Sequence, residues 1–335
     1  MTNHVLIGGK HAPQGLISRV ADCCFWFGRY VERAEATARH LQATLHLGLD
    51  GELGPRQSWH PAVIVAGEEA DFLARLGDAA LSDGEAVQRY LVWDAECGAS
   101  LVRSVIGARE NARSIREVLS GDVWEVVNEI YLFLQGPEAR DAYAQRRDEF
   151  YRHVRRMTQL ALGLMRSTML HDAVLDFIWL GVMLERANQT ARLLDVHHHA
   201  FARGERAGAD VVVSTAVWIA LLRACSGHEP FMKSHAGRVS PEAVATFLVT
   251  DARLPRSIAY AVHAAWERFC YLRPPTDVNL PGAQSLVALA SLDRWVQSLD
   301  PAELEGDGLH KVLTRIVDDT AKVAVTLGRE LLGHS

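Results

Sequence analysis

One stretch of the sequence occurs twice, and this repeat constrains the fold of the chain more than any other feature. Residues 25–41 read FWFGRYVERAEATARHL, and residues 178–194, 153 positions later, read IWLGVMLERANQTARLL. From Trp26 and Trp179 onward the copies are identical at 9 of 16 positions, where average residue usage gives about one match by chance. The repeat predicts an internal duplication, with pseudo-repeats over about 16–136 and 137–335.

Both copies have the spacing of an amphipathic helix. In the first, apolar residues recur every three or four positions from Val20 to Leu45, which is the period of one helix face. Similar patterns separated by Gly or Pro predict helices over 16–49, 61–76, 83–93, 99–119, 121–134, 139–170, 171–203, 214–225, 285–299 and 309–332, with two more beginning near Pro241 and Pro255. The only β-like runs, 63–65 and 211–213, are too short for a sheet. We therefore predict an all-α multi-helix bundle.

Composition limits the classes of protein. The 35 basic and 41 acidic residues give a net charge of −6, which argues against a nucleic-acid partner. Five cysteines without a Cys-x-x-Cys pair argue against a disulfide framework and fit a reducing compartment. Residues 1–15 contain no apolar segment for export or membrane insertion. We expect a cytoplasmic protein with no membrane partner, a flexible lead-in over 1–15 and a single helical domain over 16–335.

Polar residues flank an apolar seam in each copy, and the flanks are identical. They are Trp26, Glu32, Arg33, Thr37 and Arg39 in the first copy and Trp179, Glu185, Arg186, Thr190 and Arg192 in the second. A structural interpretation packs the seams, with their alanines Ala34 and Ala38 and the matched Ala187 and Ala191, about a pseudo-twofold axis. It predicts reciprocal ion pairs between Glu32 and Arg186 and between Glu185 and Arg33, which fix register more than they add stability.

A functional interpretation of the same residues is also open. Glu32 and Glu185 would converge on a shared cavity beside the arginines, which would bind a ligand with amine and carboxylate or phosphate groups. In an enzyme, Glu32, Glu185 or Glu110 would be the candidate general acid or base. The structural interpretation is favoured, and both roles can coexist at one axis.

Other chemical motifs are weak. We predict no cofactor and no metal, because di-metal helical bundles use Glu-x-x-His motifs, and Glu32 and Glu185 lack the histidine three positions later. His197, His198 and His199 diverge around a helix, so they do not all ligate one ion. Asp195 with His198 or His199 has better spacing, although a solvated helix end is the favoured interpretation. Arg253 and Arg256 near a helix start suit an anion, or an ordinary helix entry.

With these residues in view, the chain resembles the bacterial alpha-E family over about Leu16–Ser257. The resemblance rests on segments 18–21, 26–39, 108–113, 124–125, 181–196 and 255–257. It implies an all-α protein associated with a circularly permuted ATP-grasp ligase and, in some cases, a transglutaminase-like protein. His40 departs from the family pattern, which is apolar there, and Val182 replaces an arginine that would match Arg29.

The leading functional prediction is an accessory or substrate-presenting helical partner of an ATP-grasp ligase that forms amide or peptide bonds. It rests on the resemblance and on the lack of a nucleotide or nucleophile motif beside the duplicated charged helix. The alternatives are an enzyme that uses its buried glutamates in peptide or amino-acid modification and, more weakly, a metal-binding bundle.

Overall fold

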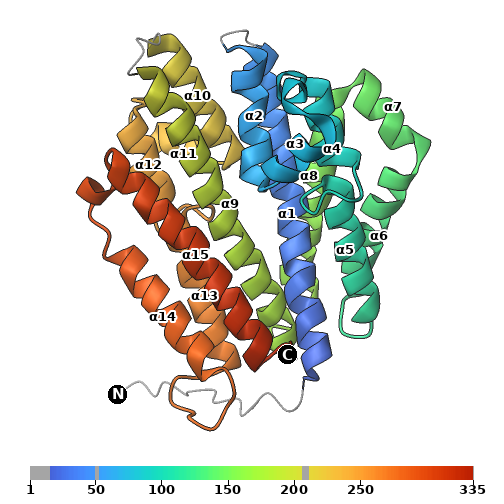
Figure 1. Ribbon diagram of the computed structural model, residues 1–335. Coiled ribbons are helices and arrows are strands. Elements are labelled where there is room, and N and C mark those ends of the chain that lie inside the picture. Colours follow the sequence, from blue (N-terminus) through green and yellow to red (C-terminus); the bar gives the residue numbers. More distant parts are fainter. Residues whose placement is uncertain (1–15, 50–52, 206–210, 335) are drawn as a thin grey trace.

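Helices make up all the regular structure of the described chain. The computed structural model describes residues 16–49, 53–205 and 211–334, and within them it contains fifteen α-helices, two 3₁₀ helices and no strand (Figure 1). The all-α prediction is therefore confirmed for this part of the chain. The expected lead-in over 1–15 lies outside the described residues, and so does most of an expected connector over 204–208.

The first group of helices surrounds α1 and forms one side of the bundle (Figure 1). Its members are α1 (Ser18–Leu49), α2 (Pro55–Ala66), α3 (Glu69–Leu76), η1 (Asp78–Ser82), α4 (Gly84–Trp93), α5 (Leu101–Ser114), α6 (Gly121–Gln135), α7 (Pro137–Gln145) and α8 (Arg147–Thr168).

The second group surrounds α9 and forms the other side (Figure 1). Its members are α9 (Ala173–Glu205), α10 (Val211–Ala224), α11 (His228–Ser234), α12 (Pro241–Thr250), α13 (Ile258–Leu272), α14 (Ala283–Gln297), η2 (Pro301–Leu304) and α15 (Asp307–Glu330). No helix in the described ranges combines the length and the hydrophobicity needed to cross a membrane.

The two groups have the same packing plan. The helices α1 and α9 run side by side in the same direction through the centre (Figure 1). On one side α5 and α8 pack against α1, and α6 contacts both; on the other side α13 and α15 pack against α9, and α14 contacts both. This plan divides the chain between α8 and α9. The pseudo-repeats expected over 16–136 and 137–335 divide the chain earlier, just after α6. In the structure, α7 and α8 pack with α6 and therefore lie in the first group.

A matched corner precedes α5 and α13. Ser100 donates from its hydroxyl to the carbonyl of Asp94 at 2.6 Å, and Ser257 donates to the carbonyl of Asp251 at 2.6 Å. Each serine also accepts a backbone N–H and caps the helix that follows it. These corners set where α5 and α13 begin, and the second one positions Arg256 beside the central helices.

Two of the helices expected from the sequence are each divided into two in the structure. The helix expected over 61–76 begins earlier, at Pro55, contains Pro61, and is interrupted after Ala66 by Gly67 in the left-handed conformation (φ +78°). Glycine adopts this conformation readily, so the chain can turn there. The single helix expected over 139–170 is two helices, because Arg146 leaves the helical conformation (φ −141°, ψ 58°).

Candidate functional site at the crossing of α1 and α9

The helices α1 and α9 come into close contact at two glycines. A Cβ atom added to Gly28 would lie 2.0 Å from the carbonyl oxygen of Ile178, and one added to Gly181 would lie 2.1 Å from that of Phe25. Both pairs of residues are matched positions of the repeat, so the two contacts are reciprocal. A side chain at either glycine would push the helices apart.

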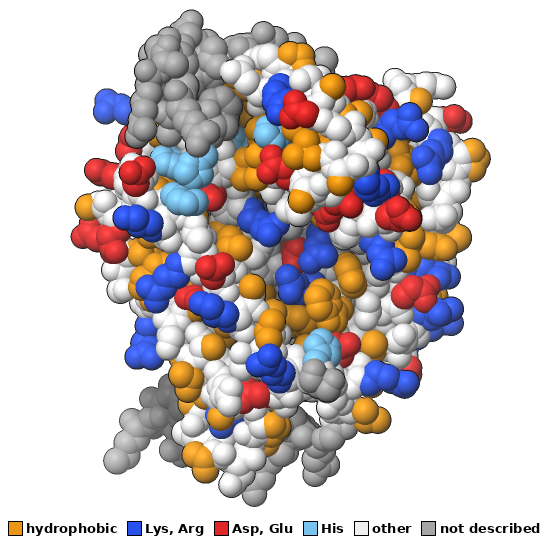
Figure 2. Space-filling model, viewed as in Figure 1, with side chains coloured by type: hydrophobic (Ala, Val, Ile, Leu, Met, Phe, Trp, Pro, Cys, Tyr) orange, Lys and Arg blue, Asp and Glu red, His pale blue; other side chains and the backbone are white. Residues whose placement is uncertain are grey.

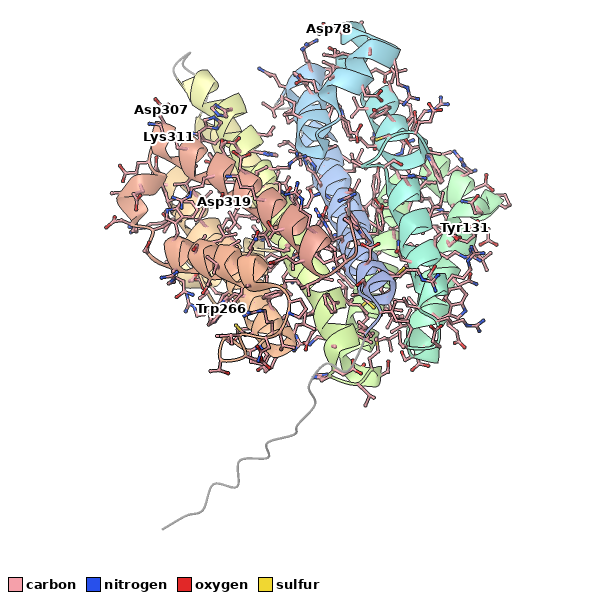
Figure 3. All side chains as sticks on the ribbon, turned by 60° about the horizontal axis from the view of Figure 1, so that its bottom comes forward. Asp78, Tyr131, Trp266, Asp307, Lys311 and Asp319 are labelled. Carbon is pink, nitrogen blue, oxygen red and sulfur yellow. The ribbon has the colours of Figure 1, made fainter. Side chains whose placement is uncertain are left out.

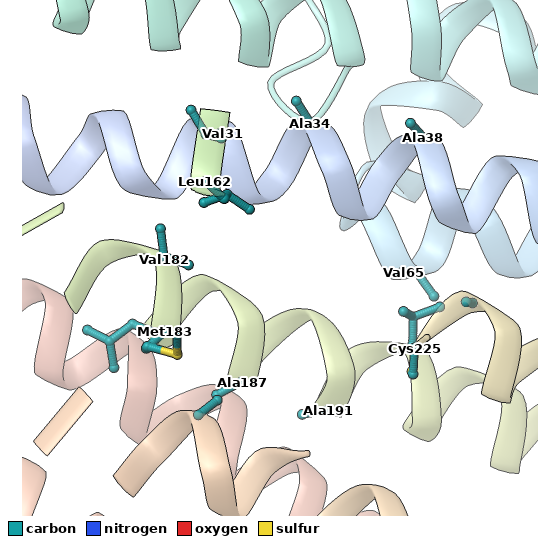
Figure 4. Close-up of a cluster of buried hydrophobic side chains, with 14 of the residues drawn as sticks. Val31, Ala34, Ala38, Val65, Leu162, Val182, Met183, Ala187, Ala191 and Cys225 are labelled. Atoms are coloured by element: carbon teal, nitrogen blue, oxygen red, sulfur yellow. The ribbon is translucent and has the colours of Figure 1, made fainter. Parts of the chain in front are cut away.

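The alanines of the predicted seam do not form this contact. At about 100° per residue, Ala34 lies about 120° and Ala38 about 80° around α1 from Gly28. Figure 4 shows both alanines on the side of α1 away from α9, and Ala187 and Ala191 on the side of α9 away from α1. The prediction that the alanine seams of α1 and α9 pack on each other was therefore wrong, because the glycine faces form the contact between the two helices.

One ion-pair cluster at the crossing is centred on Glu185 of α9, and we call it the Glu185 cluster. Arg33 donates two hydrogen bonds to its carboxylate, at 2.7 and 3.1 Å, and Arg29 donates one at 2.8 Å. Gln189, one turn later on α9, donates a further hydrogen bond at 3.1 Å. The Glu185 side chain is 2% exposed, whereas the two arginines are 17% and 18% exposed. The carboxylate is thus buried beneath two partly accessible guanidinium groups.

The second cluster is centred on Glu32 of α1, and we call it the Glu32 cluster. Arg186 donates to both carboxylate oxygens, at 3.0 and 2.8 Å, and Arg256 donates at 2.6 Å. Arg256 also donates to Glu35 at 2.7 Å, and Glu35 pairs with Arg39 one turn later. Glu32 and Glu35 are fully buried. The structure therefore contains both reciprocal ion pairs expected from the repeat, Glu32–Arg186 and Glu185–Arg33.

The charges of these clusters keep the carboxylates ionised. Burial alone would raise the pKa of Glu32, but Arg186 and Arg256 outweigh it and lower the pKa from 4.5 to about 2. The pKa of Glu185 is likewise lowered, because Arg33 and Arg29 outweigh its burial. Burial and the neighbouring Arg256 lower the pKa of Arg39 to about 10, so it stays protonated at pH 7.

Positive charge is in excess at the crossing. The eight ionisable side chains of the two clusters are three carboxylates and five guanidinium groups, which gives a net charge of 5 − 3 = +2. Figure 2 shows basic side chains around an acidic one in a hollow near the middle of the viewed face. A site of this charge favours anionic groups over cationic ones.

The remaining residues of the second predicted flank make separate contacts. Thr190 donates to the carbonyl of Arg256 at 3.0 Å, which holds the loop of the Glu32 cluster against α9. Arg192 donates to the carbonyl of Val65 at 3.2 Å and so ties α9 to α2. Trp179 is buried, with the Arg166 guanidinium 5.5 Å from its ring. None of these three joins the ion pairs directly.

The other first-copy candidates and Glu110 also differ in their surroundings. Trp26 lies against Arg29, with 5.1 Å between guanidinium and ring. Thr37 lies about 180° around α1 from Gly28, on the side opposite α9. Glu110 is on α5, where it pairs with Arg109 and Arg113 and its side chain is 44% exposed. The structure thus does not bring Glu110 into the crossing.

A pocket borders the Glu185 cluster. It has a volume of about 300 Å³, and its polar lining residues are Arg29, Asn188, Thr320 and His334. The rest of its wall is apolar and consists of Phe25 and Trp26 of α1, Leu184 of α9, three aliphatic side chains of α15, and Leu332. An apolar pocket with one guanidinium group at its edge is suited to a small molecule or chain end that carries a carboxylate.

Sequence reasoning did not place Arg29, Glu35 and Arg256 in the two clusters, although it named Arg256 as a candidate anion-binding residue. Val182 replaces the arginine matching Arg29, and Arg256 supplies the second guanidinium of the Glu32 cluster from a different element. The signal for Arg256 is the matched corner: segments 92–101 and 249–258 share Val, Asp, Ala and Ser at an offset of 157, not 153. A comparison at the single offset of 153 does not detect it.

The comparisons with known proteins fit this geometry. The model of the Alpha-E family, described as a predicted α-helical domain with a conserved ER motif, matches residues 16–331. The chain belongs to the Alpha-E family. Two of its Glu-Arg pairs, Glu32-Arg33 and Glu185-Arg186, form the reciprocal ion pairs of the crossing.

Relatives of this Alpha-E chain are much longer proteins. Uncharacterised proteins of Mycobacterium bovis and Mycobacterium tuberculosis are 26% identical to it over 262 residues. The match covers 72% of this chain but only 28% of each relative. No solved structure matches the chain.

Proposed function

We propose that this Alpha-E protein is an accessory helical partner of an ATP-grasp ligase that forms amide or peptide bonds, and that it presents a carboxylate-bearing amino acid or peptide to that enzyme. A transglutaminase-like protein is a second expected partner. The partners come from the family resemblance, and the role as a presenting protein comes from the crossing.

The observation that carries the proposal is the state of the buried carboxylates. Glu32 and Glu185 are each held by two guanidinium groups, and the pKa of each is lowered. A carboxylate with a pKa near 2 is a weak base at pH 7 and carries no proton to donate. The residues best placed for acid–base chemistry are thus engaged in holding α1 against α9.

The pocket beside the Glu185 cluster supports presentation of a ligand. Arg29 lies at the border between pocket and cluster, and the cluster has two guanidinium groups for one carboxylate. A ligand carboxylate near Arg29 would meet the uncompensated positive charge, while Trp26 and the aliphatic wall would contact its apolar part. Such a pocket would bind the ligand without reacting with it, as expected of a protein that presents a substrate to an enzyme.

The length of the relatives supports a role in a larger assembly. Because only 28% of each mycobacterial protein matches this chain, the domain there is one part of a longer polypeptide. A domain that is joined to other parts in its relatives is expected to act together with partners.

Recovery of partners from the native host tests the proposal. The tagged chain, with an unrelated helical bundle as control bait, is used to capture proteins that are identified by mass spectrometry. We expect specific enrichment of an ATP-grasp ligase. Recovery of only proteins shared with the control bait would refute the partnership.

A pocket-filling variant tests presentation separately from partnership. Ala324→Trp places a large ring in the pocket without replacing a member of an ion pair, and Val287→Trp places the same ring on the exposed face of α14. Ala324→Trp should still capture the ligase but should lower ATP-dependent product formation by the assembled system. Equal product formation with both variants would contradict a role for the pocket.

The enzyme alternative receives less support from this geometry. It requires a glutamate that exchanges a proton near pH 7, whereas Glu32 and Glu185 are ion-paired and Glu110 lies on the surface of α5 outside the crossing. A purified chain that alone modifies peptides, and loses this activity in Glu110→Gln, would favour the enzyme.

A further inference from the structure

Three metal-binding side chains meet where the C-terminal part of α9 passes the first turn of α15. Asp195 and His199 are one turn apart on α9, and His310 comes from α15, 111 positions further along the chain. Their ligand atoms all lie within 4.8 Å of one another. Figure 3 labels Asp307 and Lys311, which flank His310, at the end of α15 beside α9. The sequence analysis named Asp195 with His198 or His199 but did not identify His310 as the third ligand.

The separations between these ligand atoms suit a small divalent cation. Nδ1 of His310 lies 2.8 Å from Oδ1 of Asp195, and Nε2 of His199 lies 3.7 Å from the same oxygen. Zinc bonds to His nitrogen and carboxylate oxygen are about 2.0–2.2 Å long, so tetrahedral ligands are about 3.3–3.5 Å apart. The two observed separations lie on either side of this value, and rotations of the side chains would equalise them.

The surroundings leave the fourth position open. Asp195 is 23% exposed, and His199 and His310 are 47% and 46% exposed, so solvent reaches the three ligands. A shallow hollow of about 320 Å³, lined by His310, Lys311 and residues further along α15, opens beside His310. Two histidines, one carboxylate and an accessible fourth position form a ligand set typical of zinc sites that keep a water or an exchangeable ligand.

We infer that Asp195, His199 and His310 bind a zinc ion that links α9 to α15, with the fourth position free for water or an external ligand. The site lies apart from the two ion-pair clusters and from the pocket at Arg29. The zinc site therefore does not depend on the proposed function.

Another His–Asp pair provides the matched control. His334 lies 2.9 Å from Asp22 and is 47% exposed, which closely resembles His310 beside Asp195. No third metal-binding side chain completes this pair among the described residues. A His–Asp pair alone should bind zinc far more weakly than a set of three ligands.

The experiment uses the full chain, purified without a histidine tag and stripped of metal, and titrated with Zn²⁺ against a chromophoric chelator. We expect one site per chain in the wild type and in His334→Ala, with affinity lowered at least about tenfold in both His310→Ala and Asp195→Asn. Zn²⁺ should raise the melting temperature of the wild type but not of His310→Ala. Co²⁺ should give the absorption of a tetrahedral site in the wild type.

Two results would overturn the inference. One is zinc affinity that is equal in His310→Ala, Asp195→Asn and the wild type. The other is a wild-type chain that binds zinc no more tightly than His310→Ala does. Urea unfolding of each variant without metal checks its fold, and two variants on different helices prevent a single folding defect from deciding the outcome.

Discussion

Replacing Glu32 with Gln removes one charge from the centre of the bundle and changes almost nothing else. Gln has the same size and shape as Glu, so the substitution leaves no cavity. It does leave Arg186 and Arg256 without the carboxylate that now accepts from both of them. The Glu32 cluster would then contain three guanidinium groups and only Glu35 as an acidic partner.

The size of the loss follows from the burial and the partners of Glu32. Arg186 and Arg256 hold the pKa of its carboxyl group below the ordinary value, so the ionised form stabilises the fold at pH 7. Removal of one partner from a buried ion pair costs about 3–5 kcal/mol. We therefore expect Glu32→Gln to lower the free energy of unfolding by at least about 3 kcal/mol.

Urea unfolding at pH 7, followed by far-UV circular dichroism and tryptophan fluorescence, measures this loss. Glu110→Gln is the matched control, because its side chain is 44% exposed and its partner Arg113 is 64% exposed. The control should change the free energy of unfolding by no more than about 0.5 kcal/mol. A Glu32→Gln variant as stable as Glu110→Gln would refute the structural role of the ion pair.

Other predictions use matched pairs of variants or pH. Gly28→Ala should strongly lower the free energy of unfolding measured in urea, because its Cβ would lie 2.0 Å from a carbonyl oxygen of α9. Gly163→Ala is in open space on α8 and should raise that free energy by about 0.5–1 kcal/mol. Equal effects of the two variants would contradict the close contact. Arg256→Met should lower the free energy of unfolding by about 3 kcal/mol or more. Arg253→Met should lower it by about 0.5 kcal/mol or less, because the Arg253 side chain is 82% exposed. The urea midpoints of the two variants measure this difference. Burial lowers the pKa of His40 from 6.5 to about 3, so the unfolded state binds a proton that the folded state does not, and stability falls as pH falls from 6.5 toward 3. As the pH falls from 7.5 to 5, the stability of His40→Leu relative to the wild type should therefore rise by about 2 kcal/mol. Parallel curves of stability against pH for the two chains would contradict this.

The repeat made the centre of the fold predictable. Matched Glu-Arg pairs on two copies of one helix imply reciprocal contacts whenever the copies pack about a twofold axis, so Glu32–Arg186 and Glu185–Arg33 follow from the sequence. The contact face did not follow, because alanines and glycines both permit close approach. Only the structure shows that Gly28 and Gly181, rather than the alanines, face the partner helix.

The residues that the sequence analysis did not place in a site come from segments in which the two halves of the chain differ. Arg256 lies 224 positions from Glu32, and its matched residue in the first corner is Ala99. His310 and Asp195 likewise meet through the packing of α15 on α9, which helical periodicity does not specify. Periodicity and repetition therefore predict the helices and their shared contacts, while contacts that one half alone makes depend on the tertiary arrangement.

The guanidinium groups of the crossing hold Glu32 and Glu185 as carboxylates, which therefore do not exchange protons at neutral pH. Carbon NMR of the chain labelled at its glutamate carboxyl groups measures this directly, with the two signals assigned from Glu32→Gln and Glu185→Gln. We predict that both groups stay ionised from about pH 8 down to about pH 4, since their pKa values are lowered. Titration of either carboxyl group near neutral pH would show that the guanidinium groups do not hold it in the ionised form, and it would favour an acid–base role.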